Sequence, residues 1–312
     1  MDELAGGIRR VTLPLPTRPG HVHSYLLPGD EGWTVVDTGL GLPDARERWA
    51  GELEGLPGRV RRVVVTHFHP DHVGAARDLS ELTGAPVLQG RVDYEQCALV
   101  WGGTDWAPVL VDWFRRHGVP EHVVSELIEQ GSLYRPFIRY QPDPELLDPG
   151  DEIDGWRIVA APGHADGQLM LVRDGILVAA DHVLDPISPT VGLWPRSRPD
   201  PLADYVRALG AVVELGPTIA LPGHGEPIRD PVGRARQLIA HHEQRLEATA
   251  ATLGEEPLSG YDVSFPLFGE DLKPAARRFA VAETLSHLER LVAEGGARRI
   301  EADGGVTYTS TP

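Results

Sequence analysis

Residues 66–74 read Thr66-His67-Phe68-His69-Pro70-Asp71-His72-Val73-Gly74 and place three histidines and one aspartate within six positions. The stretch follows the β-branched run 63–65, so we expect its polar side chains to leave the end of a buried strand. Imidazoles and carboxylates are donors that zinc and similar metals accept from proteins. A chain with 13 histidines brings some pairs together by chance, but three with an intervening aspartate at this spacing predict a metal site.

Three further polar positions come directly after apolar segments that read as strands. His164 follows the strand predicted over 156–161, Asp181 and His182 follow 176–180, and His224 follows 218–221. Glycine or proline flanks several of them, as expected where a chain turns out of a sheet. This arrangement is typical of a site built along the edge of a β-sheet.

Composition excludes several classes of protein. No run of 18 apolar residues and no charged-then-apolar amino terminus appears, so we expect neither a membrane span nor a signal peptide and predict a cytoplasmic protein. The single cysteine, Cys97, excludes an internal disulfide framework and a thiolate metal cluster. The formal net charge of -17 argues against a nucleic-acid partner, because phosphate binding needs clustered basic side chains.

The order of predicted elements indicates an α/β protein in two parts. Strands and helices alternate over residues 1–230, with an aromatic-rich helical insertion at about 94–141 that we expect to form a lid or a wall of the substrate pocket. Residues 231–312 read as helices followed by a hairpin, which resembles a winged-helix unit. Twelve acidic and seven basic side chains over 241–312 argue against DNA binding by this tail.

The ordered pattern His67-x-His69-x-Asp71-His72, then His164, Asp181 and His224, resembles the metallo-β-lactamase superfamily, and specifically its glyoxalase II-like hydrolases. The resemblance covers about residues 8–227. It implies a four-layer αββα sandwich, while the helices and hairpin at the carboxyl end resemble the winged-helix tail of some members.

The resemblance also implies a role for each matching residue. His67, His69 and His164 would hold one metal ion, Asp71, His72 and His224 a second, and Asp181 would bridge both; Asp71 would also act in catalysis. We expect two divalent ions, zinc first, with iron or manganese as alternatives. True β-lactamases often carry cysteine where Asp181 stands, so antibiotic hydrolysis is not expected.

Five residues near these ligands have roles that the sequence suggests less directly. Asp37 ends a predicted strand and either orients a metal ligand or caps the next turn. His182 follows Asp181 and is either a substrate contact or proton donor, or a hydrogen-bond donor that supports a ligand. We expect Trp194 to line the pocket opposite the helical insertion, and His21 and His23 to be ordinary strand residues.

Hydrolysis of an acyl compound is the leading hypothesis for function. A hydroxide bridging two metal ions would attack a thioester, an ester or a lactone, because metal coordination lowers the pKa of water from ~15.7 to about 7. A phosphodiesterase or ribonuclease that uses the same two ions is one alternative. The other is a mononuclear iron dioxygenase acting on a thiol or persulfide. We expect a small-molecule substrate; only the ribonuclease alternative would need nucleic acid.

Overall fold

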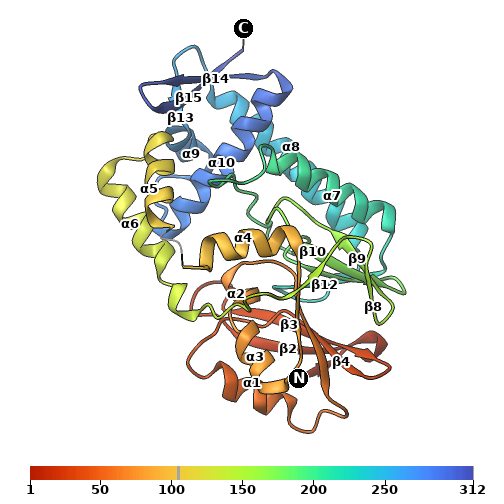
Figure 1. Cartoon of the computed structure of the whole chain (residues 1–312). Helices are drawn as coiled ribbons and strands as arrows, with labels where there is room; N and C mark the ends of the chain where they lie inside the picture. The colour runs from red at the N-terminus through yellow and green to blue at the C-terminus, as the bar shows by residue number, and fades with distance from the viewer. Residues whose placement is uncertain (104–105, 312) are drawn as a thin grey trace.

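The computed structural model describes residues 1–103 and 106–311, without the side chains of 130–132 (Figure 1). Two β-sheets pack face to face at its centre. The first has the spatial order β1 Asp2–Glu3, β2 Arg9–Pro14, β3 His21–Gly29, β4 Gly32–Val36, β5 Val60–Val65, β6 Val87–Gly90 and β7 Glu145–Leu147. The second has the order β12 Ile219–Pro222, β11 Ile176–Ala180, β10 Leu169–Arg173, β9 Trp156–Ala160 and β8 Glu152–Ile153.

The direction of the strands changes within each sheet. The strands from β1 to β4 pair antiparallel, and those from β4 to β7 pair parallel. The second sheet is antiparallel except for the β11–β12 pair. Parallel pairing brings the carboxyl ends of neighbouring strands to one edge of the sheet. The motif after β5 therefore leaves the sheet at the same edge as the chain that follows β4 and β6.

The last three residues of strand β5, Val63–Val65, are all apolar because both faces of the strand are covered there. Val63 and Val65 pack toward α1 Ala45–Leu53 and α3 Ala76–Thr83, whereas Val64 packs between the two sheets. Consecutive strand residues point to opposite faces, so a strand covered on both sides needs no polar alternation. The strand predicted from this run is confirmed.

The second sheet is covered by α7 Pro201–Leu215 and α8 Pro231–Thr252. Leu209 of α7 and Leu238 of α8 lie in one core with Leu177 of β11. The four layers of the predicted αββα sandwich are therefore present. Helix α8 begins where the domain boundary was expected, but its side chains complete the outer layer of the sandwich.

Beside the two sheet-and-helix halves of the sandwich lies a separate helical unit, called the third body from here on, at the top of Figure 1. It contains α5 Ala107–Arg116 and α6 Glu121–Ser132 from the insertion, whose first helix is α4 Arg91–Trp101, and it also contains α9 Gly260–Phe268 and α10 Pro274–Glu294. A small sheet of order β13 Leu258–Ser259, β15 Gly305–Ser310 and β14 Ala297–Ala302 completes it. Phe114, Leu127, Leu285 and Tyr308 share its core. The insertion thus packs on the carboxyl-terminal segment.

Two local predictions differ from the structure. The apolar spacing of Ala76, Leu79 and Leu82 predicts one helix over 73–83, but that helix, α3, begins at Ala76 and a separate short helix, α2 Pro70–Val73, precedes it. Between them the backbone at Gly74 touches the loop after β4, and a Cβ there would lie 2.9 Å from the Gly39 carbonyl oxygen. Helix α9 was not predicted, although Ser259 and Asp262 form a capping box at its start. Within the described residues, no helix has the length and apolar character needed to cross a bilayer.

Candidate metal centre

The candidate ligands gather where the two sheets meet, at the ends of their strands. His67 and His69 follow β5, Asp71 and His72 lie in α2, and His164 sits in the loop after β9. Asp181 directly follows β11, and His224 lies two residues beyond β12. The ligand set predicted from the motif and the later polar positions is therefore brought together in space.

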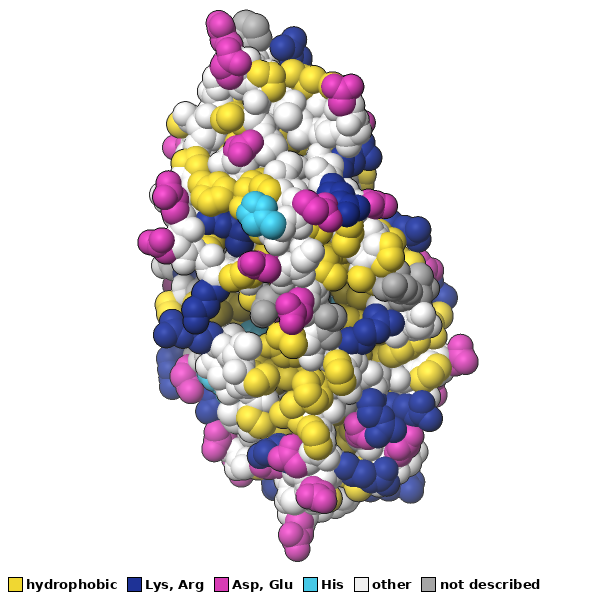
Figure 2. Space-filling view, turned by 90° about the vertical axis from the view of Figure 1, so that its left-hand side faces the viewer, with side chains coloured by type: hydrophobic (Ala, Val, Ile, Leu, Met, Phe, Trp, Pro, Cys, Tyr) yellow, Lys and Arg dark blue, Asp and Glu magenta, His cyan; other side chains and the backbone are white. Residues whose placement is uncertain are grey.

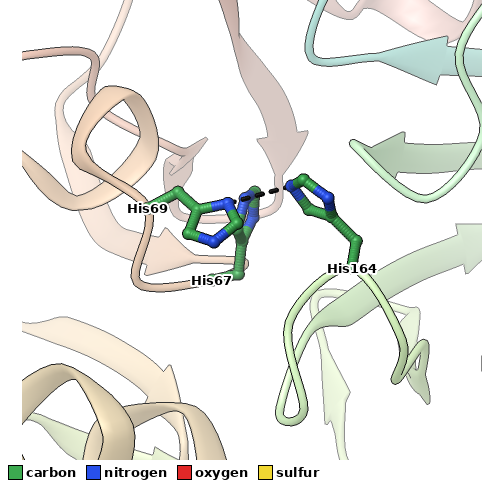
Figure 3. A group of neighbouring side chains, drawn as sticks. All are labelled: His67, His69 and His164. Carbon is green, nitrogen blue, oxygen red and sulfur yellow. Dashed lines mark hydrogen bonds between the residues drawn. The ribbon is translucent and has the colours of Figure 1, made fainter. Parts of the chain in front are cut away.

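His67, His69 and His164 form the first group (Figure 3). One donor atom from each lies within 4.8 Å of the others. His69 Nδ1 and His164 Nε2 are 2.9 Å apart and face each other from opposite loops, as the dashed line in Figure 3 shows. Burial, and then the neighbouring His164, lower the pKa of His69 to about 3. The rings of this group are neutral at physiological pH and can act as ligands.

Asp181 connects this group to a second one made of Asp71, His72 and His224. Its Oδ2 atom lies 3.4 Å from His72 Nε2, 3.7 Å from His164 Nε2 and 3.2 Å from His224 Nε2. Asp71 Oδ2 lies 3.3 Å from His224 Nε2. The carboxylate of Asp181 is thus within ligand range of both groups.

Hydrogen bonds from Nδ1 fix the orientation of four of the five histidine rings. The Nδ1–H of His164 donates to the Thr190 carbonyl at 2.8 Å, and that of His224 to the His21 carbonyl at 2.7 Å. His72 donates in the same way to Asp37, at 2.8 Å. Because these oxygens only accept, Nδ1 carries a proton in each ring, and Nε2 is the atom left for a metal ion.

His67 follows the same rule through the Thr66 hydroxyl. Thr66 Oγ1 donates to Asp37 Oδ2 at 2.8 Å, so it accepts from His67 Nδ1 at 3.0 Å. Within the described part of the chain, His67 Nε2 is then buried without a hydrogen-bond partner, as are His72 Nε2 and Asp181 Oδ1. Buried polar atoms without a partner are costly unless a ligand satisfies them. These three atoms have no hydrogen-bond partner and point toward one another, as the coordinating atoms of a metal site would.

The charges of the second group also fit cations. Burial alone would lower the pKa of His224, but the carboxylates of Asp181 and Asp71 outweigh it and raise this pKa to about 10. The pKa of His72 is likewise raised, because Asp181, Asp37 and Asp71 outweigh its burial. The carboxylates thus hold extra protons on these two rings. A metal ion would take the place of those protons, since a ligand imidazole must be neutral.

The Metallo-beta-lactamase superfamily model matches residues 17–224, a span that contains all of these candidate ligands. The chain belongs to the metallo-beta-lactamase superfamily. A second family, described as the Metallo-beta-lactamase-like, C-terminal domain, matches residues 246–311. That span covers α9, α10 and the small sheet of the third body.

Several known proteins are similar to this chain along most of its length. The Probable metallo-hydrolase YqjP of Bacillus subtilis is 28% identical over 91% of this chain and 92% of its own length. A metallo-beta-lactamase family protein from Thermus thermophilus has 34% identity, a TM-score of 0.84 and 99% coverage of both chains. A beta-lactamase domain protein from Burkholderia ambifaria has 32% identity, a TM-score of 0.88 and coverage of 99% and 94%. Together with the histidine and aspartate cluster, these similarities support a metal-dependent hydrolase.

Asp37 links two candidate ligands, His67 and His72, to the first sheet. Its carboxylate accepts from the Thr66 N–H at 2.8 Å, from the Thr66 hydroxyl and from His72 Nδ1. Of the two roles left open by the sequence, these hydrogen bonds support the orientation of candidate ligands. Asp37 has a φ of 62°, so the chain turns sharply where the carboxylate enters the site.

The expectation that His182 touches substrate is wrong in this structure. Its side chain is 0% exposed, and its ring packs against Tyr205 of α7, with the centroids 4.9 Å apart. Burial lowers its pKa to about 3, so the ring is neutral and poorly suited to donate a proton. Asp181 faces the ligands, and its neighbour points the other way, into the core beneath α7.

Trp194 is also placed differently from the prediction. We expected it opposite the insertion, but it stacks on Trp113 of α5, with 5.8 Å between centroids and an angle of 27°. It also contacts Phe279 of α10 edge-on. Trp194 therefore joins the insertion to the carboxyl-terminal helix. Of the aromatic residues of the insertion, Trp113 and Phe114 pack in the third body, whereas Trp101 and Tyr140 pack against the core of the first sheet.

His21 and His23 do more than the strand role that the sequence suggested. The Gly225 N–H donates to His21 Nε2 at 3.1 Å, and His23 Nε2 donates to the Gly225 carbonyl at 2.9 Å. Burial lowers the pKa of His23 to about 4, which keeps its ring neutral. Together with the bond from His224 to the His21 carbonyl, these contacts hold the loop that carries His224. The alternation of the two histidines on one strand face was the available signal.

Proposed function

We propose that the chain is a dinuclear hydrolase of acyl compounds, of the glyoxalase II-like kind and with zinc as the preferred ion. His67, His69 and His164 would hold one ion, and Asp71, His72 and His224 the other. The position of Asp181 carries the proposal, because one carboxylate oxygen lies 3.2–3.7 Å from ring nitrogens of both groups. An aspartate placed in this way supports a site for two cations rather than one.

When bound, such ions supply a water of lowered pKa and polarise a carbonyl group. The side chains around them do the positioning. The Asp71 side chain is 23% exposed, whereas those of His72 and Asp181 are buried, so Asp71 is the more solvent-accessible of the two candidate carboxylate ligands. We assign Asp71 a catalytic role beyond that of a ligand, which is to orient the attacking water by accepting a hydrogen bond from it.

The surroundings of the site favour a leaving group that needs no proton. His182 is buried away from the ligands, and four ligand histidines already use their Nδ1–H groups for hydrogen bonds with the protein. A thiolate, whose conjugate acid has a pKa of ~8.5, leaves without a general acid, whereas an alkoxide needs one. Among acyl compounds, we therefore propose thioesters as the best substrates.

Metal reconstitution tests this proposal. Protein stripped with a chelator is assayed with zero, one and two equivalents of zinc on a thioester, a p-nitrophenyl ester, a lactone and bis-p-nitrophenyl phosphate. We expect activity to rise up to two equivalents and to be greatest on the thioester. Asp181→Asn should lower kcat/KM about 100-fold or more, a loss of several kcal/mol of transition-state stabilisation. The matched control is Asp174→Asn, in a hairpin turn where the side chain is 89% exposed.

Three results would contradict the proposal. Preference for the phosphodiester would favour phosphoryl transfer. One iron per chain, with oxygen uptake on a thiol or persulfide, would favour the dioxygenase chemistry. Full activity in Asp181→Asn would show that the two groups of ligands do not act together.

A further inference from the structure

Helix α4 contacts the chain between two candidate ligands of the first group. The Phe68 N–H donates to Asp93 Oδ1 at 2.9 Å, and the Trp101 indole N–H donates to the Phe68 carbonyl at 2.9 Å. Phe68 stands between His67 and His69 in the chain. Asp93 lies in the first turn of α4 and Trp101 is its last residue. The two ends of one helix therefore hold both backbone polar groups of Phe68.

The same helix contacts the loop that carries His164, the third candidate ligand of this group. The Gln96 amide donates at 2.7 Å to Oδ2 of Asp166, which follows His164 by two residues. The backbone of Gly167 also lies against the start of α4, because a Cβ on Gly167 would be 2.6 Å from the Asp93 Cα. Helix α4 is therefore in contact with both loops that carry the first group.

The separation of the first-group ligands depends on two loops from different sheets. His67 and His69 follow β5 of the first sheet, whereas His164 follows β9 of the second. His69 and His164 face each other from these loops in Figure 3, with 2.9 Å between Nδ1 and Nε2. Metal ligands must be held within about 0.5 Å of their productive geometry. An element that contacts both loops can set this separation.

The second group is held by other elements. His72 donates to Asp37, and His224 donates to the His21 carbonyl. Within residues 1–103 and 106–311, no hydrogen bond joins a side chain of α4 to Asp71, His72, Asp181 or His224. A change in α4 should therefore act on the first group and spare the second.

The contacts of α4 with Phe68 lie in the interior of the molecule. Asp93 is fully buried, and Trp101 packs against the core of the first sheet. Figure 2 shows where the interior opens, at a hollow near the middle of one face with histidine at its floor. Buried hydrogen bonds are stronger than exposed ones and limit the movement of the groups they join. This interior role differs from the lid or pocket wall expected for the insertion.

We propose that α4 positions the first group of candidate ligands. Asp93 and Trp101 act through Phe68, and Gln96 acts through Asp166. They are positioning residues, because they act on an ion only through the two loops. The inference rests on the division into two ligand groups made in the proposed function, but not on the acyl substrate. It predicts that changes in α4 weaken metal binding at one group only.

Zinc affinity, measured by chelator competition in two backgrounds, tests the inference. His224→Ala removes a ligand of the second group and His69→Ala one of the first, so each background keeps one complete group. In His224→Ala, Trp101→Phe should weaken zinc binding about 10-fold, because it removes the indole donor and keeps an apolar ring. Gln96→Ala should act in the same direction through the other loop. In His69→Ala, either change should alter zinc affinity less than about twofold.

Trp33→Phe is the matched control. It removes an indole hydrogen bond of the same kind, 2.6 Å to the Pro57 carbonyl, at the opposite end of the first sheet. Asp93 offers a second pair of variants, because leucine removes the acceptor for the Phe68 N–H whereas asparagine keeps one oxygen there. Zinc affinity lost in Asp93→Leu should therefore return in Asp93→Asn, both measured in the His224→Ala background.

Equal losses in the two backgrounds, or a loss in Trp33→Phe as large as in Trp101→Phe, would overturn the inference, since both indicate general destabilisation. Unchanged zinc affinity in Trp101→Phe and Gln96→Ala would also overturn it. So would the absence of zinc binding in His224→Ala, because α4 would then have no ion site to position. The expected pattern of affinities in a protein that hydrolyses no acyl compound would support this inference and refute the proposed function.

Discussion

Asp37 shows at the scale of a single residue how the site is held before any ion binds. It is buried, and its two oxygens accept three hydrogen bonds from Thr66 and His72. Through the Thr66 hydroxyl, the same carboxylate also fixes the ring of His67. One residue outside the ligand set therefore orients a histidine from each of the two groups.

Asp37→Asn should weaken metal binding about 10- to 100-fold. The amide keeps one accepting oxygen where the carboxylate has two, and its NH2 group would face a hydrogen-bond donor of Thr66 or His72. Zinc affinity measured by chelator competition checks this prediction. Asp154→Asn is the control, since Asp154 bonds Thr34 and Arg62 at the opposite end of the first sheet. Equal zinc affinity in wild type and Asp37→Asn would contradict it.

His182 makes an unusual core residue, because its ring is fully buried and neither ring nitrogen forms a hydrogen bond of good geometry within the described residues; the Ala208 backbone is the polar group that faces it. His182→Leu removes these unsatisfied atoms and keeps an apolar side chain against Tyr205. We expect the free energy of unfolding to rise by about 1–2 kcal/mol, since each unsatisfied buried group costs on that order. Thermal unfolding and zinc content check the prediction. A variant that keeps its zinc but loses turnover tenfold would instead return His182 to the active site.

Glu283 of α10 has a pKa raised to about 7 by burial, against an ordinary value of 4.5. Because the pKa of Glu283 is higher in the folded state than in the unfolded state, folding favours the protonated carboxyl. The resulting contribution to stability is present below about pH 4.5 and is lost as the pH rises through 7. Glu283→Gln should therefore be more stable than wild type at pH 8, by roughly 2–3 kcal/mol, and the difference should shrink as the pH falls toward 4.5. Urea unfolding of both proteins across this range tests the sign, and a difference independent of pH would refute it.

The short helix α2 is the element that carries Asp71 and His72, and it depends on close contact with the loop after β4. The Thr38 N–H donates to the His72 carbonyl at 2.9 Å, and the Ala75 N–H to the Gly39 carbonyl at 3.0 Å. This approach is possible because Gly74 has no side chain between the two backbones. The helix is therefore positioned by the first sheet and not by its own four residues.

Gly74→Ala should move α2 and lower stability by about 1–3 kcal/mol, the usual cost of forcing an extra carbon into a packed site. Gly51→Ala is the matched control, because a Cβ on Gly51 in α1 meets nothing within 4 Å. There the same substitution should stabilise by up to about 1 kcal/mol, since alanine is the better helix former. Denaturation midpoints of the two variants should thus shift in opposite directions, and equal shifts would contradict the argument.

At the scale of the whole molecule, the sandwich and the third body are distinct cores joined around the site. Segments more than 100 residues apart, α5–α6 and α9–α10, pack into one of them. The loop 183–200 belongs to both, since Val183 lies in the core under α7 whereas Trp194 packs in the third body. The third body is thereby attached to the loop that orients His164.

Leu285→Ala tests whether the insertion and the carboxyl-terminal helices are stabilised by one common core, because Leu285 of α10 is fully buried in that core. We expect a loss of about 2–5 kcal/mol and faster amide exchange in α5 and α6, although the mutation lies on another segment. Leu209→Ala, equally buried under α7, should cause a similar loss without that effect on the insertion. Unchanged exchange in α5 and α6 of Leu285→Ala would show that the insertion is stabilised independently.

The sequence by itself determined the alternation of strands and helices and the candidate ligands, whereas the four-layer sandwich was implied by the family resemblance. Each ligand follows an apolar strand within a few residues, and such a signal is local, so it is readable from periodicity and spacing. The family resemblance then grouped them. The sequence could also have shown that His182 does not face the metal site. Neighbouring residues at a strand end point to opposite sides, and Asp181 already points toward the site.

Only the tertiary structure decided which distant segments share a surface. Nothing near Trp194 in the chain shows that it stacks on Trp113 of α5 or contacts Phe279 of α10. The same holds for the joint core of the insertion and the tail, and for the hold of His21 and His23 on the loop of His224. Periodicity reports which face of an element is buried, but the partner that buries it is chosen by packing across the whole chain.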